Sequence, residues 1–153
     1  MSAATHQLRK YAMTRQQVEA LFARRETALN QRDVAAISSL YADDVVVESP
    51  MAGGAVQGRT AADEVNRAFI AGFPDVSFTR DALVVDGDRV VWIGEVRGTD
   101  TGGFMGLAAT GKPFRLPMVM VFALRDGAIV REQRIYDFSG MLIQIGVLKA
   151  RPM

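Results

Sequence analysis

The sequence contains no cysteine and a single histidine, His6, which precedes the first segment with a periodic hydrophobic pattern. The absence of cysteine excludes disulfides, thiolate nucleophiles and cysteine-based metal sites. With no further histidine, a histidine-ligated zinc, a Ser-His-Asp triad and a histidine base in the core are excluded too, unless the N-terminal segment folds back. Any proton transfer inside the domain must therefore depend on other side chains.

The chain also lacks a long apolar segment and an excess of charge of one sign. No apolar run approaches the roughly 18 residues needed to span a bilayer, and residues 1–13 lack the apolar core of a secretion signal. The 18 basic and 17 acidic residues are interspersed and give a net charge of +1. We therefore expect a cytoplasmic protein that binds neither nucleic acid nor a membrane.

What is present is typical of one globular domain. The 153 residues are 49% hydrophobic and 23% charged, both ordinary values, and the length is close to that of a single domain. No repeat, linker or low-complexity segment divides the chain. We expect a flexible tail over residues 1–13 and one domain over residues 14–153.

Three helices are predicted in the first half of the chain. A capping-box pattern at Thr14 begins a helix over 14–31, a short helix follows over 34–41, and a third spans 60–72. Arg25 lies on the apolar stripe of the first helix. We expect its stem to lie along the edge of the core and its charged end to reach water; the alternative is a role in a pocket.

The second half of the chain has the period of two that is typical of strands. A short strand at 45–47 lies between the helices, and four more are joined mainly by tight turns, over 76–85, 90–99, 114–124 and 128–138. Strands joined by short turns pair antiparallel, and helices grouped ahead of them lie on one face. The predicted fold is α+β, with a curved, mainly antiparallel sheet packed against three N-terminal helices around a cone-shaped hollow. We expect the apolar segment 141–148 to cover one end of the sheet.

Two features interrupt the strand pattern. Glycines 102, 103 and 106 lack the strand–turn–helix context of a phosphate-binding loop, so we expect either a mobile flap or a tight return between strands. Pro117 indicates a bulge or an edge position, because proline cannot donate a hydrogen bond within a sheet.

A family resemblance rests on six segments: GRT at 58–60, FPDVSFT at 73–79, GTDTGGFMG at 98–106, TGK at 110–112, DGAIV at 126–130 and GMLIQIG at 140–146. In this order and at these spacings they resemble the SnoaL-like polyketide cyclase family over roughly residues 14–147. The resemblance implies the nuclear transport factor 2-like cone fold, often assembled as a homodimer. It also implies ring closure by an intramolecular aldol reaction without a metal or an organic cofactor.

The same resemblance assigns the acid/base aspartate to Asp137, near the end of the last long strand. An acid at the entrance of an apolar hollow has a raised pKa, which suits removal of a proton next to a carbonyl. Two departures from the family stand against this assignment. Asp100 replaces a common histidine, and the histidine that assists the aspartate has no counterpart. The alternative is that Asp137 is a surface carboxylate capping the turn at Ser139.

Glu95 and Arg97 share one face of their strand at a spacing that suits an ion pair. If that face lines the hollow, the pair forms a charged cluster with Asp137, and Arg97 or Tyr136 hydrogen-bonds a developing enolate. If it faces outwards, the two are a solvent-exposed or dimer-face pair. The related limonene-type epoxide hydrolases have an aspartate where this chain has Arg134, which argues against epoxide hydrolysis.

Large apolar side chains are candidates for the wall of a pocket, although such residues more often fill a core. The predicted substrate-binding residues are Phe22, Tyr41, Met51, Phe69, Trp92, Met120, Gln133 and Tyr136. The expected partner is a hydrophobic small molecule.

Two functions stay open. The first is a cofactor-independent cyclase or isomerase of a hydrophobic carbonyl compound, with Asp137 as general acid/base. The second is a non-catalytic ligand-binding or dimerisation module, and epoxide hydrolysis is a distant third. A catalyst predicts Asp137 buried in the hollow beside a hydrogen-bond donor. A binding module predicts it outside the hollow or permanently paired.

Overall fold

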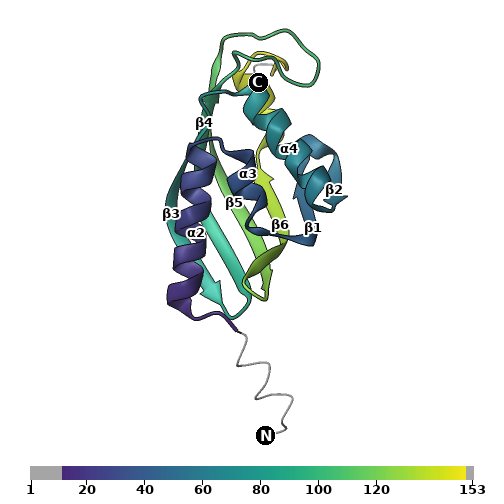
Figure 1. Ribbon diagram of the computed structural model, residues 1–153. Helices are drawn as coiled ribbons and strands as arrows, with labels where there is room; N and C mark the ends of the chain where they lie inside the picture. The colour runs from purple at the N-terminus through teal and green to yellow at the C-terminus, as the bar shows by residue number, and fades with distance from the viewer. Residues whose placement is uncertain (1–11, 151–153) are drawn as a thin grey trace, which may run out of the picture.

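The computed structural model describes residues 12–150 and contains a six-stranded sheet with helices packed on one side (Figure 1). The elements are α2 (Arg15–Asn30), α3 (Val34–Ser38), β1 (Tyr41–Ser49), η1 (Pro50–Ala52), β2 (Gly54–Gln57), α4 (Arg59–Gly72), β3 (Ser77–Asp86), β4 (Arg89–Thr99), β5 (Pro113–Arg125), β6 (Ala128–Tyr136) and α5 (Phe138–Gln144). His6 and residues 1–11 of the predicted tail lie outside the described residues. Met13, which we also assigned to that tail, packs against the core.

The sheet has the strand order β2-β1-β6-β5-β4-β3. Strands β3 to β6 form a long antiparallel meander, as the short turns predicted. Strand β1 pairs with β6 in parallel, so the sheet is mixed. Irregularities in register at Arg80/Ala82 and Ala123/Leu124 bend the strands, because an extra residue on one strand increases local twist. The predicted α+β class and curved sheet are confirmed.

The first helix begins where the sequence predicts. The Thr14 hydroxyl accepts a hydrogen bond from the Gln17 amide at 3.1 Å, and the Gln17 side chain accepts one from the Thr14 amide at 2.9 Å. This reciprocal pair satisfies two amide donors that the helix itself leaves free.

None of the helices within residues 12–150 is both long and apolar enough to cross a membrane.

Element boundaries differ from the prediction at three places. The short helix ends at Ser38, and Tyr41 begins strand β1. Strand β2 was missed, because four residues are too few to show an alternation. At the other end of the chain, β6 stops at Tyr136, and Asp137 and Phe138 begin helix α5 instead of ending the strand.

Helices α2, α3 and α4 lie across one face of the sheet, and the core fills the space between (Figure 1). Edge-to-face aromatic contacts cross this space, with ring centroids 4.8 Å apart for Phe22 and Phe122 and 4.7 Å apart for Phe73 and Phe114. The interior is therefore mostly packed side chains and not the open hollow that we expected.

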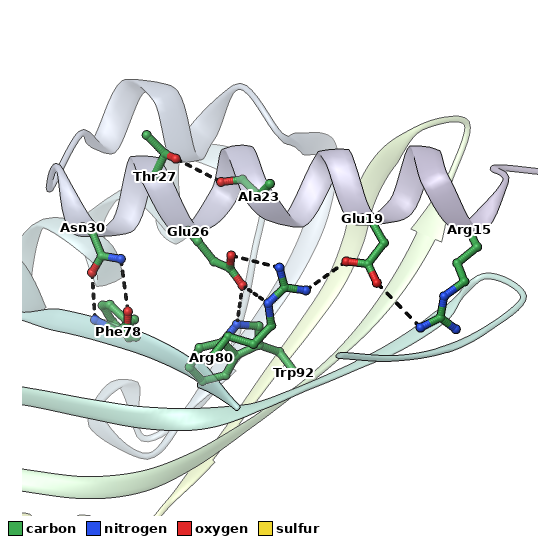
Figure 2. Close-up of polar contacts among 9 residues, drawn as sticks. All are labelled: Arg15, Glu19, Ala23, Glu26, Thr27, Asn30, Phe78, Arg80 and Trp92. Carbon is green, nitrogen blue, oxygen red and sulfur yellow. Dashed lines mark hydrogen bonds and ion pairs between the residues drawn. The ribbon is translucent and has the colours of Figure 1, made fainter. Parts of the chain in front are cut away.

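Helix α2 is fastened to β3 and β4 by the polar contacts in Figure 2. The Trp92 indole donates to Glu26 at 3.0 Å, and Arg80 pairs with Glu26 at 2.7 Å and with Glu19 at 3.0 Å. The Trp92 ring lies close to position 94 of β4. A Cβ there would be 2.5 Å from the indole ring, so glycine at this position leaves room for it. Trp92 thus belongs to the junction of helix and sheet.

The glycine-rich segment between β4 and β5 is a long loop over residues 100–112, closed at its base by Asp100. The Asp100 amide donates to the Lys112 carbonyl at 3.0 Å, and the Asp100 carboxylate accepts from the amide and hydroxyl of Thr110, each at 3.1 Å. Gly102 lies so close to the end of α4 that an added Cβ would come within 1.7 Å of the Ala71 carbonyl oxygen. Pro117 is at an edge, because the pairing of β5 with β6 begins one residue later, at Met118.

Candidate functional site

Five polar residues meet in the interior between the helices and the sheet. They come from four separate elements, and all are buried: Arg25 of α2, Tyr41 of β1, Asn66 of α4, and Glu132 and Arg134 of β6. We call them the interior polar cluster. Burial of so many polar groups in one place is costly unless they satisfy one another, so their contacts decide what the cluster is able to do.

Glu132 is the centre of the interior polar cluster. One of its carboxylate oxygens pairs with Arg25 and accepts from the Tyr41 hydroxyl at 3.1 Å. The other accepts from Arg134 at 2.7 Å. Arg134 also donates to the Asn66 side-chain oxygen at 2.5 Å. Both oxygens of Glu132 are therefore occupied by strong donors.

The position of Arg25 contradicts our expectation that its charged end would reach water. The residue is only 1% exposed. Its guanidinium lies over the rings of Phe122, at 5.0 Å, and Tyr41, at 5.8 Å, with one nitrogen 4.0 Å from the Met120 sulfur. The aromatic faces and the Glu132 carboxylate offset part of the free-energy cost of burying this cation.

The charges of the interior polar cluster are fixed at neutral pH. Burial by itself would raise the pKa of Glu132, but the two guanidinium groups and their hydrogen bonds outweigh burial and leave that pKa below its ordinary value. Burial would lower the pKa of Arg134, and the Glu132 charge outweighs it and raises that pKa. Glu132 is thus a weak base, held as a carboxylate.

Tyr136 extends the cluster along β6. Residues 132, 134 and 136 point to the same side of the strand, because side chains alternate between its faces. Burial raises the pKa of the Tyr136 phenol, while the nearby Ser49 hydroxyl, the Arg134 charge and the Met51 backbone act less strongly in the opposite direction. Within residues 12–150 the phenol oxygen is buried and makes no hydrogen bond of normal geometry. The phenol is therefore neutral at pH 7, and the Ser49 hydroxyl and the Met51 backbone are close enough to act on it without a hydrogen bond of normal geometry.

An apolar groove with a volume of about 360 Å³ lies against α4, and one of its lining residues, Met51, has its backbone next to the Tyr136 phenol. The groove runs between α4, the η1–β2 segment and the loop that follows β4, and its lining is Met51, Ala52, Val56, Ala61, Glu64, Val65, Ala68, Phe104 and Met105. The size falls within the range of small-molecule sites, which are mostly apolar with a few polar groups. Deeper inside, Arg134 and Asn66 border a second cavity of about 10 Å³, room for about one water molecule.

Asp137 lies outside this arrangement. It is exposed, and its side chain accepts from the Gly140 amide at 2.8 Å as the N-cap of α5. The surface alternative that we weighed for this residue, a carboxylate capping the turn, is therefore what the structure contains. The reason is that the chain leaves the sheet one residue earlier than expected.

Glu95 and Arg97 also point away from the interior. Trp92 and Val96 occupy the inner face of β4, so Glu95 and Arg97 are on the outer one, where Glu95 pairs with Arg97 at 3.6 Å and with Arg115 at 2.6 Å. Gln133 is on the same outer side of the sheet, opposite Val121. The predicted charged cluster of Glu95, Arg97 and Asp137 does not form.

The other predicted wall residues fall into three places. Phe22, Phe69 and Trp92 are core side chains. Tyr41 and Met120 contact Arg25 in the interior polar cluster. Met51 lines the apolar groove, and Tyr136 is close to Arg134 and to the Met51 backbone but does not itself line the groove.

Sequence reasoning missed Glu132, Arg134, Asn66 and the groove residues of α4. A signal existed for the first two, since an acid and an arginine two apart on a strand form the same pattern as Glu95 and Arg97. Which of the two strands turns its pair inwards depends on helix packing. Nothing in the sequence marks Asn66, which simply lies on the inner face of α4.

A curved six-stranded sheet wrapped around three helices, with polar groups buried inside, defines the nuclear transport factor 2-like or ketosteroid isomerase-like class of fold. Solved structures agree. The chain superposes with a TM-score of 0.73 on a ketosteroid isomerase-like protein of Catenulispora acidiphila crystallised with trimethylamine, at 22% identity over 86% of this chain and 97% of that one. It superposes with a TM-score of 0.75 on AclR, a proposed hydroxylase of Streptomyces galilaeus, at 24% identity over 88% of this chain and 83% of that one.

The family follows from the sequence match. The pattern of the SnoaL-like polyketide cyclases matches residues 19–145, so the chain belongs to that family. IdmH of Streptomyces antibioticus, a proposed polyketide cyclase, is 32% identical over 84% of this chain and 97% of its own, with a TM-score of 0.71. No protein with a curated description matches the chain.

Proposed function

We propose that this protein binds a hydrophobic carbonyl compound in the apolar groove and acts on it as a cofactor-independent cyclase or isomerase. The observation that carries the proposal is an apolar groove of ligand size, one of whose lining residues, Met51, has its backbone next to the buried Tyr136 phenol. A carbonyl oxygen at the inner end of the groove would accept from this phenol. The hydrogen bond strengthens as the oxygen gains negative charge in an enolate, which is how a placed donor lowers a barrier.

The proton acceptor has to be reassigned, because Asp137 lies outside. Among residues 12–150 the carboxylate that lines the groove is Glu64 of α4. We assign the removal of the proton next to the carbonyl to Glu64, and the stabilisation of the resulting enolate to Tyr136. Glu132 does not suit the role of base, since two arginines lower its pKa.

A non-catalytic binding module is the second candidate. It is favoured by the position of Asp137, whose only side-chain hydrogen bond among the described residues caps α5, and by the permanent pairing of Glu132. In that case the groove would hold the same class of ligand without changing it. The two functions therefore predict the same binding and differ in proton exchange.

The exchange of hydrogen for deuterium next to a carbonyl separates these functions. In D₂O the methyl protons of 2-acetylnaphthalene exchange through its enolate, and NMR follows the rate with and without protein. We expect acceleration by the wild type, a loss of at least about tenfold in Tyr136→Phe, the size of one lost donor, and a similar loss in Glu64→Gln. Asp137→Asn is the matched control and should exchange at the wild-type rate.

Binding of the same ketone, measured by calorimetry, completes the test. Bound ketone without accelerated exchange would support the binding module instead of the enzyme. An exchange rate in Tyr136→Phe equal to that of the wild type would contradict the role of the phenol. A lower exchange rate in Asp137→Asn would indicate that Asp137 is the proton acceptor.

A further inference from the structure

The interior polar cluster contains two guanidinium groups and one carboxylate in direct contact. Arg25 is 1% exposed, Arg134 8% and Glu132 0%. Within residues 12–150 neither arginine pairs with a second carboxylate. Tyr41 and Asn66 are neutral, so the cluster carries one unmatched positive charge in the interior.

Arg25 is the arginine with unmet hydrogen-bonding capacity. Its Nε and Nη1 atoms are buried and have no hydrogen-bond partner among the described residues. The aromatic faces of Phe122 and Tyr41 offset part of the desolvation of this cation but accept no conventional hydrogen bond from it. Buried donors and buried charges in proteins usually have partners, so the interior is arranged to receive negative charge.

The positive charge lies next to the ligand position that we proposed. Arg134 precedes Tyr136 by two residues on the same face of β6, a separation of about 7 Å along a strand. The Arg134 charge acts on the Tyr136 phenol, and the Met51 backbone beside that phenol belongs to the residue that lines the groove. A group at Tyr136 is therefore within range of Arg134 in surroundings that screen charge poorly.

We propose that the ligand carries a negative charge at the end that reaches Tyr136, as a carboxylate or an ionised enol or phenol. This inference rests on the proposed function and adds the charge of the substrate. A cation would be repelled by the unmatched arginine, and a neutral ketone would gain only the phenol hydrogen bond. Glu64 does not oppose the anion strongly, because its side chain is exposed to water, which screens its charge.

Three probes of one shape but different charge test the proposal: 2-naphthoate, neutral 2-acetylnaphthalene and cationic naphthalen-2-ylmethylamine. Calorimetric titration uses the full chain in a chloride-free buffer, so that no small anion competes. We expect 2-naphthoate to bind at least tenfold more tightly than the ketone, and the amine to bind most weakly.

Two variants neutralise the cluster by independent routes. Arg134→Met leaves the pair of Arg25 and Glu132, and Arg25→Met leaves the pair of Arg134 and Glu132. In either one, 2-naphthoate should bind no more tightly than the ketone. Arg134→Lys keeps the charge and should keep the preference, while Arg115→Met removes an exposed arginine of the outer face and should leave all three affinities unchanged. Circular dichroism shows which variants are folded.

The possible results separate this inference from the proposed function. If the ketone binds and 2-naphthoate binds no more tightly, the proposed negative charge of the ligand is wrong, but ligand binding in the groove is still supported. If the preference for the anion survives in both methionine variants, its source is not the cluster, and the proposal is overturned. Should none of the three probes bind, the groove itself would be contradicted. If neither methionine variant folds, a preference for the amine or the ketone over 2-naphthoate in the wild type still overturns the proposal.

Discussion

Glu132 shows how one residue's surroundings reverse its chemistry. A carboxylate without charged neighbours in a protein interior has a raised pKa and is a useful base. Glu132 is fully buried, yet Arg134 and Arg25 lower its pKa. The acid that the interior polar cluster contains is thus stabilised as an anion and is not available as a base.

The pairing of Glu132 predicts a pH dependence of stability. Its pKa in the folded state is below the unfolded value, so its contribution is fully present above about pH 5 and is lost as the pH falls through the folded pKa. We expect Glu132→Gln to unfold more easily at pH 7 by about 3–5 kcal/mol, because it leaves two buried cations unpaired. The difference from wild type should narrow between pH 5 and pH 3, as measured by urea denaturation.

The Glu95→Gln variant is the control for that experiment, since Glu95 is only partly buried, its partners are exposed arginines and its effect should be small throughout. A difference between wild type and Glu132→Gln that stays constant down to pH 3 would contradict the lowered pKa.

At the scale of elements, the start of helix α5 determines the role of Asp137. A helix begins where a side chain accepts a hydrogen bond from a free amide, and Asp137 does this for Gly140. A Cβ at position 140 would lie 2.2 Å from the Asp137 carboxylate, so glycine there allows the cap to form. The residue that resembles the family's acid/base aspartate is in this chain a structural cap.

The cap can be tested apart from activity. Asp137→Ala should lower the free energy of unfolding by about 0.5–2 kcal/mol, the usual loss for an N-cap, whereas Asp137→Asn should stay close to wild type because asparagine caps equally well. Urea denaturation measures both variants. An alanine variant as stable as wild type would show that the contact with Gly140 contributes nothing to folding.

At the scale of the whole molecule, the face of the sheet opposite the helices is uncovered in Figure 1. Directly opposed residues form two apolar rows on this outer face, Val84–Val91–Val121 and Ala82–Ile93–Val119–Ile135. Val84 is 52% exposed and Ile135 49%. An apolar face of this kind on a domain favours association.

We predict that a second copy of the chain covers this face. Four strands at about 4.8 Å and two rows at about 6.7 Å give an apolar surface on the order of 260 Å². The polar and charged residues around it would supply the rest of the roughly 800 Å² that each partner buries in a standard interface. Because an isologous interface places a central residue near its own copy, Ile93→Glu should bring two carboxylates together and give a monomer.

Sedimentation equilibrium distinguishes the outcomes. We expect a dimer for wild type and for Leu148→Glu, which changes an exposed leucine beyond helix α5 and away from the sheet face, and a monomer for Ile93→Glu. A monomeric wild type, or a dimer that persists in Ile93→Glu, would contradict this prediction.

Local patterns in the sequence determined the elements and their order. The capping box at Thr14, the N-cap at Asp33 and the tight turns at 86–88 and 126–127 act over a few residues, so they can be predicted without knowledge of the fold. The family segments led to the same sheet and helices, and the matching pattern over residues 19–145 confirmed the family.

Only the tertiary structure decided which side chains form the site. Alternation along a strand assigns residues to two faces but does not say which face the helices cover, and so the orientation of Glu95 and Arg97 stayed open and Glu132 and Arg134 were missed. The interior position of Arg25 depends in the same way on a carboxylate 107 positions further along the chain. Contacts between residues so distant in sequence form only when the helices close over the sheet, and they fix both the charge of the interior and the surroundings of the Tyr136 phenol.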